Sequence, residues 1–156
     1  MNDACVGESA PEKGVATIEA AYQKGSITAV AFKNGVECSR YTLCTTDKAA
    51  AIKVTAEKDT FAADRRDLCY FDISITDGQG RIVNEAQDEL VCTVMGGELM
   101  GIFSGDPCNE DQYTSNRCHA FKGRAVAIVR TDKPGNVGIK VYSENLAAGY
   151  ACAKAE

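Results

Sequence analysis

Apolar and polar residues alternate with a period of two along most of the chain, which is typical of strands with one buried face. In residues 69–76 (CYFDISIT), Phe71, Ile73 and Ile75 share one face and mostly polar residues take the other. The same pattern predicts strands over residues 26–33, 36–46, 50–56, 90–95, 99–103, 125–130 and 137–143, with a short piece at 81–83. It also predicts a strand over residues 15–22, although the alanines there would suit a helix as well. The pattern therefore predicts an all-β protein.

Turn residues separate these strands. Asn34-Gly35 is a strong hairpin signal because both positions of such a turn need a positive φ. Further turns are predicted at 77–80 (DGQG), at Gly96-Gly97 and at 133–136 (KPGN). Many short strands between such turns predict an immunoglobulin-like β-sandwich.

The strand pattern breaks at residues 46–48, which predicts a boundary between two modules. We expect residues 1–48 to be the C-terminal part of one sandwich and residues 49–147 to be a complete sandwich. Residues 148–156 show no pattern and are expected to be a frayed tail.

Composition and charge disfavour several classes of partner. The 156 residues are 45% apolar and 25% charged with a net charge of −5, which describes a globular protein and disfavours a nucleic-acid partner. No apolar run has the roughly 20 residues of a membrane helix, so no membrane partner is expected. The N-terminus lacks the pattern of a signal peptide, which leads to the expectation of a cytoplasmic protein.

Eight cysteines need an explanation. Cys69 and Cys92 lie in predicted strands, so we expect reduced and mostly buried thiols, with a disulfide framework as the alternative. A zinc site is disfavoured because the only histidine, His119, adjoins Cys118, and neighbours on a strand point to opposite faces. The same geometry disfavours a Cys118–His119 nucleophile pair.

The longest polar stretch is 104–118 (SGDPCNEDQYTSNRC), predicted to be a surface loop. Asp106 is expected to accept backbone N–H bonds and fix a turn. Asp106, Glu110 and Asp111 would suit calcium, but their spacing matches no calcium loop and a solvated acidic loop is favoured. Tyr113 is a candidate exposed platform for a sugar.

Several motifs resemble the immunoglobulin-like, or invasin-like, domain that ends many glycoside hydrolases of family 2. They are Ile52–Lys58 (IKVTAEK), Ala63–Leu68 (ADRRDL), Asp77–Val83 (DGQGRIV), Phe103–Pro107 (FSGDP), Arg117–Gly123 (RCHAFKG) and Pro134-Gly135. Asp64-Arg65-Arg66 departs from the pattern, since a glycine is usual there. Residues 2–7 (NDACVG) and 25–35 (GSITAVAFKNG) resemble the end of the preceding sandwich in the same enzymes, which implies a fragment.

The resemblance implies a non-catalytic C-terminal structural module of a β-galactosidase. In that family the two catalytic glutamates lie on an upstream barrel, so no catalytic, cofactor-binding or metal-binding residue is expected here. The implied partners are the upstream catalytic and sugar-binding domains, with a homodimer through the open edge of the first module as a further expectation. The alternative is an adhesin-type or carbohydrate-binding immunoglobulin-like module.

The long loop is where a contact with other domains is expected, because its family counterpart carries the Gly-Asp-Pro element. The candidate contact residues are Asp106, Asn109, Glu110, Asp111 and Tyr113. A mobile surface loop without contacts is the equally weighted alternative.

Overall fold

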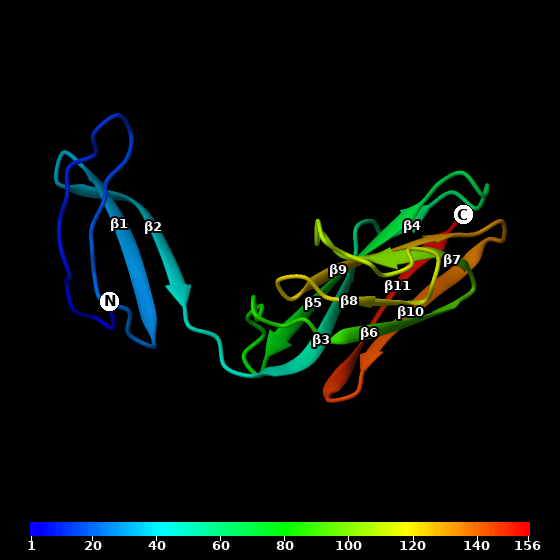
Figure 1. The fold of residues 1–156 in the computed structure, drawn as a ribbon. Coiled ribbons are helices and arrows are strands. Elements are labelled where there is room, and N and C mark those ends of the chain that lie inside the picture. Colours follow the sequence, from blue (N-terminus) through cyan, green and yellow to red (C-terminus); the bar gives the residue numbers. More distant parts are fainter. The chain divides into compact units, whose positions relative to one another are not determined.

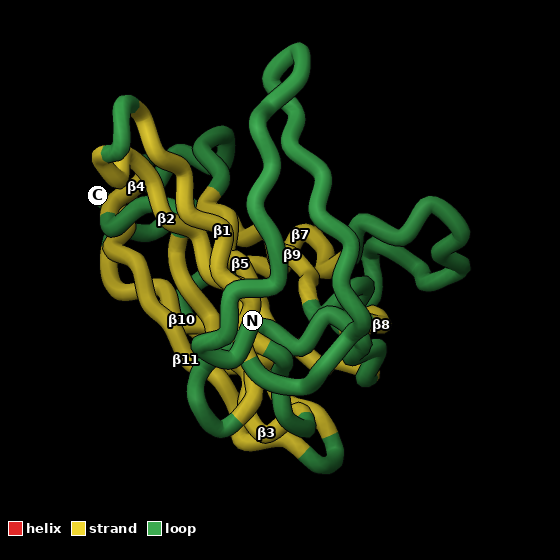
Figure 2. The backbone as a smooth tube through the Cα atoms, turned by 90° about the vertical axis from the view of Figure 1, so that its left-hand side faces the viewer, coloured by secondary structure: helices red, strands yellow, loops and turns green.

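The computed structural model describes residues 1–156, all of them in strands, turns and loops (Figure 2). The chain forms two compact units, Met1–Thr45 and Thr46–Glu156. The structure has no helix long and apolar enough to cross a membrane.

The first unit is built on one antiparallel hairpin. Strand β1 (Ser26–Lys33) pairs with β2 (Val36–Cys44), as the sequence predicted to within two residues. Asn34 and Gly35 turn the chain with φ values of 53° and 77°, which confirms the predicted turn. One face of the hairpin carries Ile27, Tyr41 and Leu43, which are 44%, 69% and 57% exposed.

The segment before β1 is a loop, so the strand predicted over residues 15–22 is wrong (Figure 2). Its only ladder contact is an isolated bridge between Glu12 and Val15, closed by the turn at Lys13 and Gly14. The alternation of residues 15–22 has no partner strand within this unit, and a strand needs a partner for its backbone groups. Asn2 ties the segment to β1 by accepting a bond from Ser26 N at 2.8 Å and donating to Ser26 O at 2.9 Å.

The second unit is a β-sandwich of nine strands (Figure 1). They are β3 (Ala49–Ala56), β4 (Thr60–Phe61), β5 (Cys69–Asp77), β6 (Glu89–Met95), β7 (Glu98–Phe103), β8 (Arg117–His119), β9 (Arg124–Arg130), β10 (Gly135–Ser143) and β11 (Leu146–Ala155). Strands β7-β9-β5-β3 form one antiparallel layer and β11-β10-β6-β8 the other. The layers join where Ala51 of β3 pairs in parallel with Ala147 of β11, and β4 adds to β11.

The core of this sandwich follows from the period-two pattern. Phe71, Ile73 and Ile75 of β5 are at most 1% exposed, as predicted. They belong to one buried cluster with Val137 and Ile139 of β10 in the other layer. An immunoglobulin-like β-sandwich is therefore the correct fold class, and a separate unit with one two-stranded sheet precedes it in the chain.

The frayed tail expected at residues 148–156 is wrong, because β11 is an integral strand. Ala153 and Ala155 are buried in the core. Gly149 permits a close approach of β11 to β3, since a Cβ there would lie 2.5 Å from the carbonyl oxygen of Ile52. Alanine and glycine carry little hydrophobic signal, so the alternation of this strand is hidden in the sequence.

A buried carboxylate anchors the start of this unit. The side chain of Asp77 accepts bonds from Asp47 N at 3.1 Å, Gln79 N at 2.9 Å and Arg81 Nε at 2.8 Å. Burial by itself would raise the pKa of Asp77, but the bonds from Arg81, Asp47 and Gln79 outweigh it and hold the pKa well below its usual range. The turn after β5 is thereby fastened to the residues that lead into β3.

Candidate functional site

The loop between β7 and β8 is ordered by its own short polar residues. Asp106 Oδ1 accepts a bond from Cys108 N at 2.9 Å, which confirms the expected turn. Asn109 Oδ1 accepts one from Asp111 N at 2.7 Å. Such bonds from a side chain to the backbone two residues on are the usual turn-forming role of Asp and Asn.

Asp111 fastens the loop to β8. Its Oδ2 accepts a bond from His119 N at 2.6 Å, and its Oδ1 lies 3.0 Å from His119 Nδ1. The backbone bond from His119 lowers the pKa of Asp111, partial burial opposes this, and the bond from the His119 ring adds to the lowering. Asp111 therefore points back to the sandwich rather than outward.

The other residues expected at this loop lie apart from that anchor. Glu110 is exposed. Tyr113 is 57% exposed, and its ring meets the ring of Phe103 edge to face with centroids 6.0 Å apart. Ser104 Oγ and Asn109 Nδ2 are buried without a hydrogen-bond partner. The loop thus has exposed side chains at Glu110 and Tyr113 and two buried polar atoms that make no hydrogen bond.

No three His, Cys, Asp or Glu side chains form a group that could hold a metal ion. Cys118 is buried whereas His119 is exposed, as the alternation along β8 predicts. Burial raises the pKa of Cys118 to about 12, and the charge of Asp111 adds to the effect. Cys118 and His119 therefore make no nucleophile and base pair.

The expectation of mostly buried thiols is wrong. Only Cys69, Cys92 and Cys118 are buried, while Cys5, Cys38, Cys44, Cys108 and Cys152 are exposed and all eight are unpaired. The reason is positional. Three of the exposed thiols belong to the first unit, where two strands enclose no core, one lies in the long loop and one on the outer face of β11.

The outer face of β10 and β11 carries an aromatic pair that the sequence did not predict. The Lys140 ammonium lies 5.7 Å from the ring centroid of Tyr142 and 5.5 Å from that of Tyr150. Tyr150 is 64% exposed and Tyr142 is 40% exposed. Alternation along β10 places Lys140 and Tyr142 on one face. The position of Tyr150 beside them could not be predicted, because residues 148–156 were expected to be a tail and not a strand.

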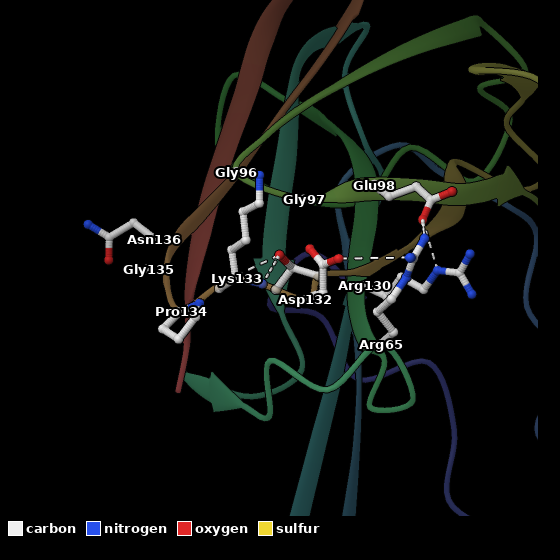
Figure 3. Close-up of a pocket in the computed structure, with 11 residues that line it drawn as sticks. Arg65, Gly96, Gly97, Glu98, Arg130, Asp132, Lys133, Pro134, Gly135 and Asn136 are labelled. Atoms are coloured by element: carbon white, nitrogen blue, oxygen red, sulfur yellow. Dashed lines mark hydrogen bonds and ion pairs between the residues drawn. The ribbon is translucent and has the colours of Figure 1, made fainter.

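A charged hollow of about 540 Å³ opens at the end of the sandwich where the β6–β7 and β9–β10 turns meet (Figure 3). No sequence pattern predicted this hollow, because its residues come from three segments that are distant in the chain. The lining residues are Arg65, Gly96, Gly97, Glu98, Arg130, Thr131, Asp132, Lys133, Pro134, Gly135 and Asn136. We call this the end hollow.

Ion pairs cross the end hollow. Glu98 Oε2 accepts a bond from Arg130 Nε at 2.9 Å and lies 3.7 Å from a guanidinium nitrogen of Arg65. A second Arg65 nitrogen lies 3.8 Å from Asp132 Oδ2. The bond from Arg130 lowers the pKa of Glu98, so this carboxylate is ionised at neutral pH.

Comparison with known proteins places the sandwich in a family. Residues 52–151 match the family model of the glycoside hydrolase family 2 C-terminal domain 5. The chain belongs to this family. The resemblance seen in the sequence motifs is thereby confirmed, and the match extends into β11, beyond the expected tail boundary.

Relatives of this family 2 domain are much longer proteins. Beta-galactosidase BoGH2A of Bacteroides ovatus is 27% identical over 127 residues, covering 80% of this chain and 15% of the relative. A solved family 2 glycosyl hydrolase of Bacteroides cellulosilyticus has a TM-score of 0.91 at 20% identity, and the match covers 98% of this chain and 22% of the hydrolase chain. A solved family 2 β-glucuronidase has a TM-score of 0.86 at 25% identity, and the match covers 100% of this chain and 17% of the glucuronidase chain. The chain thus spans less than a quarter of each.

A looser likeness bears on the fold alone. The D00-D0 domain of intimin has a TM-score of 0.52 at 15% identity, covering 89% of this chain and 70% of its own. It supports the immunoglobulin-like architecture of this family 2 domain and carries no functional argument at that identity.

Proposed function

We propose that this chain is a non-catalytic structural module of a larger family 2 glycosidase, and that the parent enzyme is a β-galactosidase. The observation that carries the proposal is the family match at residues 52–151, because the matched model describes a C-terminal domain. The small share of the relatives that the chain spans, 15% to 22% in the three compared above, supports it. The name of the Bacteroides ovatus relative supports a galactoside as the substrate of the parent.

The test of the non-catalytic role is an assay of the purified chain. Family 2 catalysis needs two carboxylates in one cleft, and the family resemblance puts both on an upstream barrel. We expect no turnover of a chromogenic β-galactoside or β-glucuronide by this chain. Turnover that is abolished by a substitution within the chain would overturn the proposal.

We infer that the upstream domains of the parent are the partners of the first unit. Support comes from the apolar face of Ile27, Tyr41 and Leu43, which a two-stranded hairpin leaves uncovered. A hairpin of this kind is marginal by itself, and an exposed apolar face marks a surface that another element covers. In a longer recombinant chain that includes the upstream residues, amides of β1 and β2 should exchange more slowly with deuterium than in this chain. Equal exchange in both would contradict the inference.

The homodimer is a separate proposal for the chain in isolation. Open strand edges recruit further strands, and β1 and β2 pair only with each other. The solution mass should then rise from monomer to dimer with concentration. A monomeric mass at every concentration would contradict it.

We also propose that the long loop contacts another domain or subunit of the parent. The exposed Glu110 and the 57% exposed Tyr113 support this, because aromatic side chains left at the surface are enriched where another domain or subunit binds. Replacing residues 109–115 by a Gly-Ser linker in the full-length parent should weaken assembly or activity. Replacing the hairpin tip at Asn34-Gly35 by Gly-Gly is the control. Unchanged kinetics, stability and oligomeric state in the loop variant would retire the proposal.

A further inference from the structure

We propose that the end hollow binds a sugar acid, that is, a ligand with one carboxylate beside several hydroxyl groups. The volume of about 540 Å³ lies within the range of small-molecule sites. The lining residues combine cations with acidic side chains, which is unlike a plain anion site.

Two of the three cations at the end hollow, Arg65 and Lys133, make no hydrogen bond to a carboxylate. The Lys133 ammonium makes no ion pair in the structure, and its side chain extends toward Gly96 and Gly97 (Figure 3). Arg65 reaches Glu98 and Asp132 only at 3.7 Å and 3.8 Å, beyond hydrogen-bond distance. Arg130 is engaged by Glu98 at 2.9 Å. A ligand carboxylate would therefore be held between Lys133 and the planar fork of Arg65.

The two acidic side chains at the hollow favour a ligand that also carries hydroxyl groups. Glu98 and Asp132 offer carboxylate oxygens that accept bonds from hydroxyl groups. A compact anion such as phosphate meets the same cations but brings more negative charge and fewer hydroxyl donors to these two carboxylates. A neutral sugar leaves the charge of Lys133 unpaired. A sugar ring that carries both a carboxylate and hydroxyl groups can bind the cations through its carboxylate and donate hydrogen bonds to Glu98 and Asp132 through its hydroxyl groups.

Arg65 has an uncommon backbone conformation. Its φ is 62°, in the left-handed region that residues with a long side chain rarely adopt. The conformation is held by the bond from Arg65 N to Thr131 O at 3.0 Å and by Asp64 Oδ1, which accepts from Arg66 N and Asp67 N at 2.8 Å each. Such a conformation persists only where its surroundings determine it, and it places the guanidinium at the hollow.

The segment of Lys133 is fixed in a similar way. Lys133 N donates to Thr131 Oγ1 at 3.1 Å, and Thr131 is itself buried. The floor of the hollow is close-packed, since a Cβ on Gly97 would lie 2.9 Å from a methyl of Val129 and 3.0 Å from Arg130 O. The side chains of Arg65 and Lys133 therefore stand on backbone that is already in place before a ligand arrives.

The test is an NMR titration of the full chain with sodium D-glucuronate. We expect saturable shifts of the amides of Gly96, Gly97 and Lys133. Sodium acetate should bind about tenfold more weakly because it lacks the hydroxyl groups, and D-glucose should cause no shift at these amides. Acetate or glucose binding as well as glucuronate would overturn the proposal, as would the absence of saturable shifts. A poly-glutamate peptide that binds more tightly than glucuronate would overturn it in favour of an acidic protein segment.

Two variants locate the site. Arg65→Asn removes the guanidinium while retaining a residue that tolerates the left-handed conformation, and Lys133→Met removes the ammonium while retaining the length of the stem. Each should weaken glucuronate binding by about tenfold or more. Arg66→Gln is the matched control, because Arg66 is exposed and lies outside the lining, and its affinity should equal that of the unmodified chain. Unchanged affinity in both Arg65→Asn and Lys133→Met, with folded spectra, would overturn the assignment.

Discussion

Arg81 holds the buried carboxylate of Asp77 through two bonds, from its backbone N to Oδ1 at 3.0 Å and from its Nε to Oδ2 at 2.8 Å. Oδ2 also accepts the backbone bond from Asp47 at 3.1 Å. One side chain therefore joins the turn after β5 to the residues that enter the sandwich. Because the Asp77 side chain is fully buried, its partners cannot be replaced by water without opening the turn.

Replacing Asp77 by Asn should lower the Tm of the second unit by on the order of 10 °C, because an amide cannot accept all the bonds that the buried carboxylate accepts. Asp72→Asn is the control, since Asp72 is an exposed residue of the same strand. Thermal unfolding followed by circular dichroism measures both. Equal shifts in the two variants would contradict the anchoring role.

The lowered pKa of Asp77 also sets a pH dependence. A depressed folded-state pKa gives stability that is complete above the unfolded value of about 3.9 and is lost as the pH falls from there toward the folded value. The unmodified chain should lose stability more steeply than Asp77→Asn below about pH 4. Parallel pH profiles for the two chains would count against the assignment.

The thiols should fall into two classes. Cys5, Cys38, Cys44, Cys108 and Cys152 are exposed and should react within minutes with a thiol reagent at about pH 8. Burial raises the pKa of both Cys92 and Cys118 to about 12, so these two and the buried Cys69 should react only after denaturation. A native count near five and a denatured, unreduced count near eight are expected. A denatured count near zero would instead indicate disulfides.

Asp111→Ala should release the long loop without unfolding the sandwich. Its bonds to His119 N and Nδ1 tie the middle of the loop to β8, whereas the Ser115–Arg117 bonds tie only its end, so deuterium exchange over residues 105–114 should accelerate by about tenfold. Glu110→Ala is the matched control because its side chain is exposed. If both variants exchange like the unmodified chain, the Asp111–His119 contact has no part in ordering the loop.

The close approach of β11 to β3 should make Gly149→Ala destabilising by about 1–3 kcal/mol. The new Cβ would lie 2.5 Å from Ile52 O and 2.8 Å from a methyl of Val54. Gly105→Ala is the control, since nothing lies within 4 Å of a Cβ there. Urea unfolding measures both free energies, and a neutral Gly149→Ala would show that β11 packs less closely than the structure describes.

Part of the long-loop site was accessible from the sequence. Asp106 follows from local chemistry, because an aspartate before a proline favours a turn that its own carboxylate caps. The role of Asp111 was not accessible. It depends on the register of β6 against β8, which pairs Leu90 with Cys118 and so sets the position of the neighbouring His119. Register between strands is a property of tertiary pairing.

Neighbouring residues are enough to predict the strands with a strong alternation, the Asn34-Gly35 turn and the motifs of the family, because period and turn chemistry are local. Long-range pairing makes a strand of the alanine-rich residues 146–155 and brings Arg65, Glu98 and Lys133 to one hollow. Neither outcome could be predicted from local pattern, and both have the same cause. Alanine and glycine acquire their burial from the strand packed against them, and residues far apart in the chain meet only through the pairing of whole strands.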